Sequence, residues 1–548
     1  MLIATSETIF DRYLYCCGYG YSARDIVLGK KGLEEYIHKG GDPLKLSDGR
    51  YVIGYLDNQD QLIYFSDSHG TDLLFYYSDD HFWAVSSSVY ALAKLLKNKG
   101  ISLTLNRANL SSYFVQSSIF EQPLSDKQIF EEIKILDRRY YIRIKALSLD
   151  IVKKPRSRIY DEVCGKSILG RIGYFISFYR KMFEQLLSLN MNVELELSGG
   201  VDSRLNMGLF LPYMKTKQVK VTTDKSKVDD YLVVQKLKSK FEFEYSSSMP
   251  VTSNVNDKIY KYNIYKLAHL FVSRTVKRPN SRLRTDNPIY SNIRINGGGG
   301  EVGRLFYNIN VEAYRNCIDR SILSQEYKEI LKQELSDVCR HLDYDGNPSK
   351  AMIELYKYRN IYFVGRSWYH FLIGVTFTPM ISSIYSSITE LSRDSEFGIE
   401  LNSFMESNFL QNFIIYQLEK ELLNLPFDNH VKNGNAKSFL DKNMYNIDIS
   451  DIYQIKDFNI YGNLESIINL SETRDFININ MPTYDLKMSY EDMIYSDIGD
   501  DGLELLRVSG VLSDDAFLDI KAKYEARELS KIDELSILNA VEALRIAE

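Results

Sequence analysis

The stretch ELELSGGVDSRLNM, residues 194–207, constrains the fold of this chain more than any other feature. Alternating apolar residues over 193–197 predict a strand, Ser198-Gly199-Gly200 predicts a turn, and a helix is expected from Val201. A strand that leads through small residues into a helix presents backbone N–H groups and the positive end of a helix dipole. The stretch therefore predicts an anion site, for which phosphate is the usual ligand.

The side chains of this turn suit a polyphosphate with its metal ion. The hydroxyls of Ser198 and Ser203 can donate hydrogen bonds, the glycines permit close approach of the backbone, and Asp202 can hold Mg2+. No Gly-Lys-Ser/Thr sequence follows, so the turn is not of the Walker type. The pattern SGGxDS is similar to the pyrophosphatase loop of enzymes that split ATP between the α and β phosphates. The alternative is an ordinary glycine-rich turn between a strand and a helix.

Composition sets the broad class of the protein. A chain of 548 residues with 45% hydrophobic and 26% charged residues is expected to form two or more soluble globular domains. The net charge of −6 and the lack of a basic block predict no nucleic-acid partner. No apolar run reaches the roughly 18 residues of a membrane span, and the first residues lack a basic region followed by an apolar core. We therefore expect a cytoplasmic protein with no membrane partner.

The five cysteines are scattered and odd in number: Cys16, Cys17, Cys164, Cys317 and Cys339. They show neither CxxC spacing nor paired histidines, so neither a disulfide framework nor a zinc site is predicted. This usage favours a reducing compartment.

Residues 1 to about 155 are predicted to form a β-rich domain. Hairpins are expected from 51–56 with 61–65, from 73–77 with 82–86 and within 139–152, together with a short helix over 89–96. No glycine-rich loop or cluster of metal ligands interrupts this region, so it shows no chemistry of its own.

Strands and helices alternate around the glycine turn. Strands are predicted over 193–197, 219–222, 243–245 and 293–295, and helices over 167–189, 201–211 and 229–241. Such alternation predicts a parallel sheet covered by helices, with ligands at the carboxyl ends of the strands. The strand over 293–295 runs into Asn296-Gly297-Gly298-Gly299-Gly300-Glu301, which we interpret as a second phosphate-side turn followed by an acid. A flexible loop is the alternative.

The remainder is predicted to be mainly helical. Helices are expected through residues 310–425 with a break at Thr378-Pro379-Met380, and a polar loop follows Pro426. Residues from about 440 to 485 show little pattern. Helices close the chain, one starting at Leu512-Ser513-Asp514-Asp515 and the last over 532–546.

These features together resemble the asparagine synthetase family, whose relatives include the β-lactam synthetases and the lasso peptide cyclases. The resemblance is carried by Ser198-Gly199-Gly200-Val201-Asp202-Ser203, by Gly297-Gly298-Gly299-Gly300-Glu301 and by the β-rich segments Gly54-Tyr55-Leu56-Asp57 and Ser66-Asp67-Ser68-His69-Gly70. It implies an α+β architecture in two parts. Residues 1–155 would form a degenerate glutaminase-like (Ntn) β-sandwich. Residues 160–548 would form an α/β pyrophosphatase-loop (adenine nucleotide α hydrolase-like) synthetase domain, with a nucleotide-binding core over 165–305 and a helical part over 310–548.

The family implies a specific reaction, with ATP and Mg2+ as cofactors. ATP adenylates a substrate carboxylate and releases pyrophosphate, and an amine then attacks the acyl-adenylate to give an amide and AMP. The implied ATP-binding residues are Leu197, Ser198, Gly199, Gly200, Val201, Asp202, Ser203, Val221, Thr222, Gly297, Gly298, Gly299 and Gly300. Asp230 is expected to lie near the nucleotide as well.

The implied Mg2+ ligands are Asp202 and Glu301, where relatives usually carry Asp at the second position. Glu301 is therefore also a candidate catalytic residue. Gly298 stands where relatives often carry an acid or a histidine, so any catalytic role of that position is absent. A lysine that stabilises the adenylation transition state is expected in the loop after Pro426, which offers Lys432 and Lys437; Lys437 fits the family spacing better.

One departure from asparagine synthetase changes the expected source of the amine. The glutaminases of that family use an N-terminal cysteine exposed by removal of Met1, and this chain has Leu2 in that place. The front domain is therefore not expected to hydrolyse glutamine. The amine would be free ammonia or an amino group of a small-molecule or peptide substrate, and a homodimer is left open.

Two other functional classes remain open from the sequence. SGGxDS loops also serve ATP-dependent tRNA-modifying thiolases, although the acidic charge argues against one. A catalytically silent nucleotide-binding regulatory or scaffold protein is the other alternative. Substrate specificity would lie in the helical part, where the candidates are Tyr356, Tyr358, Arg359, Arg366, Trp368 and Tyr369, although residues at this spacing also suit ordinary packing.

Overall fold

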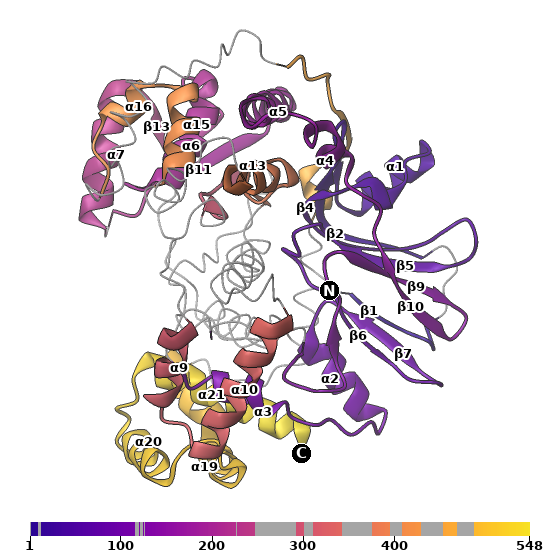
Figure 1. Cartoon of the computed structure of the whole chain (residues 1–548), viewed down its shortest axis with the longest axis vertical. Helices are drawn as coiled ribbons and strands as arrows, with labels where there is room; N and C mark the ends of the chain where they lie inside the picture. Colours follow the sequence, from indigo (N-terminus) through magenta and orange to yellow (C-terminus); the bar gives the residue numbers. More distant parts are fainter. Residues whose placement is uncertain are drawn as a thin grey trace.

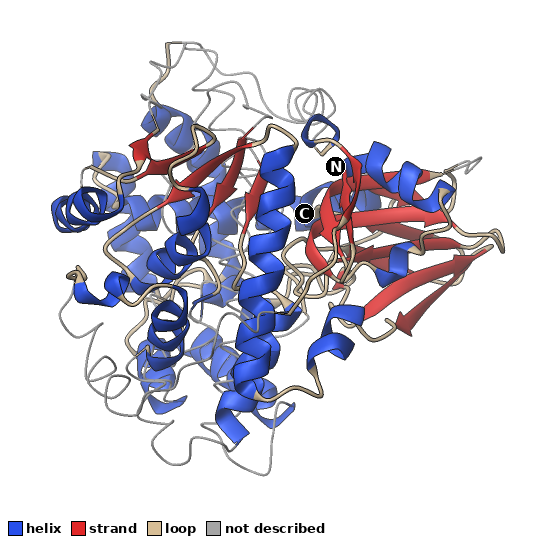
Figure 2. Cartoon of the chain, turned by 90° about the horizontal axis from the view of Figure 1, so that it is seen from above, coloured by secondary structure: helices blue, strands red, loops and turns tan. Residues whose placement is uncertain are grey.

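The computed structural model (Figure 1) has an α+β architecture with both antiparallel and parallel sheets. The residues that it describes are 2–8, 13–115, 120, 124, 127–225, 227–246, 292–300, 311–341, 375–394, 408–428, 453–467 and 487–548. Figure 2 shows the strands of the N-terminal sheets gathered on one side of the molecule and most helices on the other. No helix within these ranges is both long and apolar enough to cross a bilayer.

The N-terminal strands form two sheets within the described residues. The first has the order β1-β7-β6-β8 and the second the order β10-β9-β5-β4-β2-β3-β16. The strands are β1 Ile3–Thr5, β2 Leu14–Tyr21, β3 Asp25–Leu28, β4 Asp48–Leu56, β5 Leu62–Ser66, β6 Phe75–Ser78, β7 Trp83–Ser86, β8 Lys134–Ile135, β9 Tyr140–Lys145 and β10 Ser148–Lys153. The helices of this region are α1 Gly29–His38, α2 Val89–Asn98 and α3 Arg107–Ser112. The predicted hairpins β4–β5, β6–β7 and β9–β10 and the helix α2 are confirmed.

The two sheets pack face to face around a shared apolar layer. Val52 and Tyr64 of the second sheet and Trp83 and Val85 of the first are at most 3% exposed and belong to one cluster. Alternating strand residues place one set of side chains on each face, so the apolar sets of the two sheets meet. We call residues 2–153 the β-rich region.

A third sheet is entirely parallel and has the order β13-β12-β11-β14-β15 among the described residues. Its strands are β11 Asn192–Glu196, β12 Val219–Thr222, β13 Glu244–Tyr245, β14 Asn292–Ile295 and β15 Val375–Phe377. The helices beside it are α4 Arg158–Val163, α5 Ile168–Ser188, α6 Val201–Phe210 and α7 Val228–Phe241. The predicted parallel sheet and the helices α5, α6 and α7 are confirmed.

Strand β15 corrects the prediction that residues 310–425 are helical. Its three residues, Val375-Thr376-Phe377, are too few to show the alternation that identifies a strand. They are strand-like because β15 pairs in parallel with β14, from Ile293 opposite Val375 to Ile295 opposite Phe377. Pairing with a distant segment decided the conformation here.

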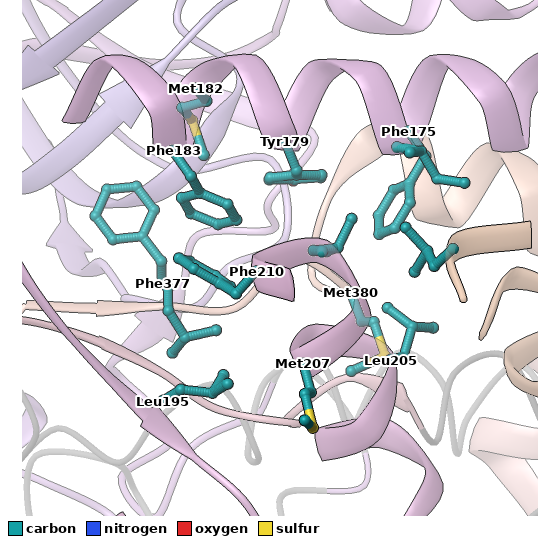
Figure 3. Close-up of a cluster of buried hydrophobic side chains, with 14 of the residues drawn as sticks. Phe175, Tyr179, Met182, Phe183, Leu195, Leu205, Met207, Phe210, Phe377 and Met380 are labelled. Atoms are coloured by element: carbon teal, nitrogen blue, oxygen red, sulfur yellow. The ribbon is translucent and has the colours of Figure 1, made fainter. Parts of the chain in front are cut away.

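The parallel sheet is covered by the aromatic face of α5. Figure 3 shows Phe175, Tyr179 and Phe183 of α5 pointing toward α6 and the sheet. The rings of Phe183 and Phe210 lie 4.2 Å apart between centroids, and Leu195 of β11 is fully buried below them. Burial of this apolar layer fixes α6, and with it the turn that precedes α6, against the sheet.

The C-terminal helices complete the molecule. They are α9 Val311–Asp319, α10 Gln325–His341, α13 Ser383–Asp394, α15 Phe409–Leu418, α16 Glu421–Asn424, α19 Tyr490–Ser509, α20 Asp514–Ala526 and α21 Lys531–Ala547. The predicted start of α20 is confirmed, since the Ser513 hydroxyl accepts a hydrogen bond from the Ala516 N–H. α9, α10, α19, α20 and α21 lie together, beside α3, at the lower left of Figure 1.

The β-rich region and the C-terminal part of the chain contribute residues to one apolar cluster and strands to one sheet. One apolar cluster contains residues of α2 and α3 together with residues of α10, α19 and α21. In addition, β16 Asn459–Gly462, from a segment with little sequence pattern, pairs in parallel with β3. Contacts between residues far apart in the chain therefore tie the two predicted parts into one packed body.

Candidate nucleotide site

The two glycine turns lie side by side at one edge of the parallel sheet. β11 and β14 are neighbours and run in parallel with Leu195 opposite Ile295, so residues 197–200 and 296–300 leave the sheet at the same edge. The chain moves outward from β11 to β12 and β13, then returns to β14 beside β11 and continues to β15. The sheet order therefore reverses between β11 and β14. Open parallel sheets bind ligands at such a reversal, beyond the carboxyl ends of the strands.

The first turn, residues 198–203, is held largely by its own side chains. The Ser203 hydroxyl oxygen accepts from the Ser198 N–H at 3.1 Å and lies 3.1 Å from the Ser198 hydroxyl. The Ser198 hydroxyl oxygen in turn accepts from the Gly200 N–H at 3.1 Å. Helix α6 begins at Val201 with Gly200 as its N-cap, and no side chain of the described residues caps it. The first N–H groups of α6 therefore point at the space above the turn, as an anion site requires.

Gly199 is enclosed by two acidic residues from distant segments. Its N–H donates to Asp230 Oδ1 at 2.8 Å, and its carbonyl accepts from the Asp428 N–H at 3.1 Å. A Cβ at this position would lie 2.5 Å from Asp428 Cβ, so only glycine fits. Asp230, which the sequence predicts to lie near the nucleotide, is a residue of α7 and contacts the first turn directly.

The second turn, residues 297–300, rests directly on Asp202 of the first. Cβ atoms built on Gly297 and Gly300 would lie 3.1 Å from Asp202 Cβ and 2.1 Å from Asp202 Oδ1, respectively. Gly299 has φ +86°, in the left-handed region that favours glycine. The half-buried Asp202 carboxylate is therefore packed between the two turns, where a carboxylate could hold a metal ion beside a polyphosphate.

Polar side chains from neighbouring helices hold the second turn. Gln411 of α15 donates through Nε2 to the Gly300 carbonyl at 2.7 Å, and Asn206 of α6 donates through Nδ2 to the Asn296 carbonyl at 2.6 Å. Asn296 Oδ1 accepts from the Gly298 N–H at 3.1 Å. Both Gln411 and Asn206 are fully buried. Sequence reasoning missed them because nothing local marks a buried amide on a helix as the support of a distant turn.

Arg204, immediately after the SGGVDS motif, is fully buried beside the first turn. Its guanidinium donates to the carbonyls of Leu422, Leu425 and Pro426 at 2.6–2.9 Å and lies over the Phe427 ring at 3.7 Å. Burial lowers the pKa of Arg204 to about 10, partly offset by the nearby charge of Asp428. Arg204 thereby fastens residues 422–428 to the first turn.

Strand β12 offers polar atoms on the other side of the first turn. Val221 is fully buried and its carbonyl accepts from the Ser246 N–H at 2.8 Å, while the Thr222 carbonyl accepts from the Leu197 N–H at 2.9 Å. The hydroxyl of Thr223, directly after the strand, is buried without a hydrogen-bond partner in the described part of the chain. A buried hydroxyl with no partner at the carboxyl end of a strand marks Thr223 as a further candidate for contact with a ligand.

Several predicted site residues lie outside the described residues. These are Glu301, Lys432 and Lys437, together with the specificity candidates Tyr356, Tyr358, Arg359, Arg366, Trp368 and Tyr369. Of the two predicted Mg2+ ligands, the structure therefore describes Asp202 alone. Within the described ranges no group of three or more His, Cys, Asp or Glu residues forms a metal site.

The start of the β-rich region is packed into its core. The Leu2 side chain is 1% exposed, and its N–H donates to the Ser87 hydroxyl at 3.0 Å. Cys16 and Cys17 lie within β2, and burial raises the pKa of both thiols. A thiol whose pKa is raised is a poor nucleophile at neutral pH. The five cysteines are all free.

Comparison with known proteins adds no relative to this picture. No protein-family model matches the chain, and no curated protein matches it. The family resemblance therefore continues to rest on the two glycine motifs and the β-rich segments of the sequence, and it remains a prediction.

Proposed function

We propose that this protein is an ATP-dependent, AMP-forming amide synthetase that adenylates a substrate carboxylate and couples it to an amine without hydrolysing glutamine. The observation that supports the proposal best is the meeting of two glycine turns on Asp202 at the reversal of a parallel sheet. Such a place suits a nucleotide polyphosphate.

In this proposal the main described groups of the site have definite tasks. The first N–H groups of α6 and the hydroxyls of Ser198 and Ser203 bind the pyrophosphate portion of ATP. Asp202 holds Mg2+, which when bound neutralises charge on the phosphates. The glycines of the second turn keep that side of the site narrow and free of side chains, and Thr223 would contact the sugar or base.

The amine is expected to come from the substrate or from free ammonia. Glutamine hydrolysis in the asparagine synthetase family needs a nucleophilic cysteine at the position that Leu2 occupies. Leu2 is an apolar residue of the core, and Cys16 and Cys17 lie within a sheet strand. In this proposal the β-rich region has a role other than supplying ammonia.

The proposal is tested by pyrophosphate release. The full chain is incubated with Mg·ATP and a panel of amino acid, sugar acid and peptide carboxylates with amines, and pyrophosphate and AMP are quantified. Pyrophosphate should appear only with an appropriate carboxylate, and Asp202→Ala should abolish it. Asp229→Ala, an exposed acid on the first turn of α7, is the matched control and should retain the activity. Undiminished release by Asp202→Ala would overturn the assignment of this turn.

A nucleotide-binding protein without turnover is the second candidate, because the Gly199 N–H is already bonded to the Asp230 carboxylate. An internal anion on one N–H of the turn leaves fewer donors to stabilise a transition state. Calorimetry decides between the two. Binding of Mg·ATP with no pyrophosphate release across the panel would favour this second candidate.

A further inference from the structure

We infer that the β-rich region positions the second glycine turn of the nucleotide site, and that Asp48 and Tyr19 are the positioning residues. This inference rests on the proposed nucleotide site but adds a task for the region that precedes it. Both residues come from the second N-terminal sheet, Tyr19 from β2 and Asp48 from the first position of β4. Both reach across to the segment from β15 to the start of α13, residues 376–383.

Asp48 caps helix α13 from outside the synthetase part of the chain. Its carboxylate accepts from the Ser383 N–H at 3.0 Å and from the Ser383 hydroxyl at 2.6 Å, and Ser383 is the first residue of α13. His69 Nε2 lies 3.1 Å from the same carboxylate and donates to it. Asp48 is fully buried, and its carboxylate faces these partners and the positive end of the α13 dipole.

Tyr19 holds the other end of the same segment. Its hydroxyl donates to the Thr376 carbonyl at 2.8 Å, and its ring stacks on Phe377 with centroids 3.9 Å apart and planes at 20°. Tyr19 is 3% exposed, so the bond is shielded from water. The β-rich region therefore fixes residues 376 and 383 and leaves the turn 378–382 between them.

The turn between these two contacts lies against the second glycine turn. A Cβ on Gly299 would lie 2.5 Å from Ile381 Cγ1 and 3.1 Å from the Ile381 nitrogen, so the two backbones are in close contact. The Thr378 hydroxyl donates to Asn296 Oδ1 at 3.4 Å, and the Phe377 carbonyl accepts from the Asn296 N–H at 3.4 Å. Displacement of residues 378–382 would therefore move the second glycine turn relative to Asp202.

Burial of a carboxylate between two surfaces costs desolvation free energy, and apolar side chains of similar volume often stabilise such a contact at least as well. What a carboxylate adds is direction, because it accepts hydrogen bonds only from donors placed at defined positions. The cap on Ser383 therefore fixes where α13 begins, and this determines where Ile381 meets Gly299.

The test separates positioning from mere stability with matched pairs of variants. Asp48→Asn is paired with Asp67→Asn, because the Asp67 carboxylate is equally buried but accepts from His69, Thr71 and Asp72 within the β-rich region. Tyr19→Phe is paired with Tyr51→Phe, whose hydroxyl donates to the Leu46 carbonyl at 2.8 Å. The Kd for Mg·ATP is measured by calorimetry, and the free energy of unfolding by denaturant titration.

We expect Asp48→Asn to raise the Kd for Mg·ATP about tenfold and Tyr19→Phe about threefold. Asp67→Asn and Tyr51→Phe should lower stability by similar amounts and leave the Kd within about twofold of the unmodified chain. Asp48→Glu, which keeps a carboxylate at this position, should lose less affinity for Mg·ATP than Asp48→Asn. Equal loss of affinity in the test and control variants would overturn the inference.

Amide hydrogen exchange of residues 292–300 tests the positioning role independently of the proposed function. Exchange should accelerate in Asp48→Asn and Tyr19→Phe but not in the paired controls, whether or not ATP is present. If the unmodified chain binds no Mg·ATP, the proposed function fails and this exchange alone decides whether the β-rich region holds the turn. Unchanged exchange in Asp48→Asn would refute the positioning role even if ATP binds.

Discussion

The two glycine turns lie at the same edge of the same sheet, yet they are held in opposite ways. The first turn carries its own hydrogen-bonding side chains, Ser198 and Ser203, within six consecutive residues. The second has glycines at 297–300, and the side chains of Asn296, Asn206 and Gln411 form hydrogen bonds with the backbone of residues 296–300. The hydrogen bonds of the first turn are thus mostly local, apart from those of Gly199 with Asp230 and Asp428, whereas the second turn takes its shape mainly from its neighbours.

The two halves of one site can therefore depend on contacts at very different separations along the chain. A defect in Ser198 or Ser203 should remain near the first turn. A defect in Gln411, in Asp48 or in the turn after β15 should reach the second turn from far away in the sequence. The following variants test this contrast, in order of decreasing expected effect.

Arg204→Met should have the largest effect and would show how far the first turn depends on its surroundings. Three carbonyls lose a charged donor, that of Leu422 buried and those of Leu425 and Pro426 partly buried, so the free energy of unfolding should fall by about 3 kcal/mol. Denaturant titration measures the loss, and hydrogen exchange should accelerate at residues 422–428. Arg171→Met is the matched control, because Arg171 also donates to three carbonyls, those of Cys164, Lys166 and Ser387. It should lose similar stability without faster exchange at 422–428; faster exchange there in both would contradict the role of Arg204.

Gly300→Ala should be the next most damaging change and acts where the two turns touch. A Cβ would lie 2.1 Å from Asp202 Oδ1, so either the carboxylate or the turn must shift, and overpacking of this kind costs about 2 kcal/mol. We expect Mg·ATP binding to be lost in calorimetry. Gly165→Ala, whose added Cβ would have no neighbouring atom of the described residues within 4 Å, should leave both stability and binding unchanged. Full binding by Gly300→Ala would mean that the two turns are not closely packed in solution.

Gln411→Met removes a support of the second turn while conserving most of the volume. The Gly300 carbonyl loses its buried donor, which should lower the free energy of unfolding by about 1.5 kcal/mol. Hydrogen exchange should accelerate at residues 297–300 and stay unchanged at 198–203. In Gln218→Met, which removes a donor to the Leu187 carbonyl, exchange at both turns should be unaffected. Equal acceleration of hydrogen exchange at the two turns after Gln411→Met would contradict the difference in how the two turns are held.

Ser203→Ala should have the smallest effect, about 1 kcal/mol, and should stay local. The Ser198 N–H loses its acceptor, but the Gly200 N–H still donates to the Ser198 hydroxyl and the Gly199 N–H to Asp230. Exchange should rise at residues 198–203 only. Ser177→Ala, which removes a buried hydroxyl bonded to the Gly173 carbonyl, serves as the control. A faster exchange at 297–300 in Ser203→Ala would show that the second turn depends on the first.

The strand, turn and helix around the SGGVDS motif, and the alternation of strands and helices that indicates a parallel sheet, could be predicted from the amino-acid sequence. Each of these follows from residues a few positions apart: alternating apolar side chains over 193–197, small residues at 198–200 and helical spacing in α5 and α6. The hairpins β4–β5, β6–β7 and β9–β10 were predictable for the same reason.

The contacts that hold the second turn against the first could not be predicted, because they depend on the tertiary fold. Gln411 lies 111 positions from Gly300, Asp48 lies 335 positions from Ser383, and β15 is a strand because β14 runs beside it. The periodicity of apolar residues shows which face of a helix or strand is buried. It does not show which distant backbone group a buried amide or carboxylate will contact. The contact of Gly300 with Asp202 arises because β11 and β14 are adjacent and parallel, and that adjacency is a property of the folded sheet.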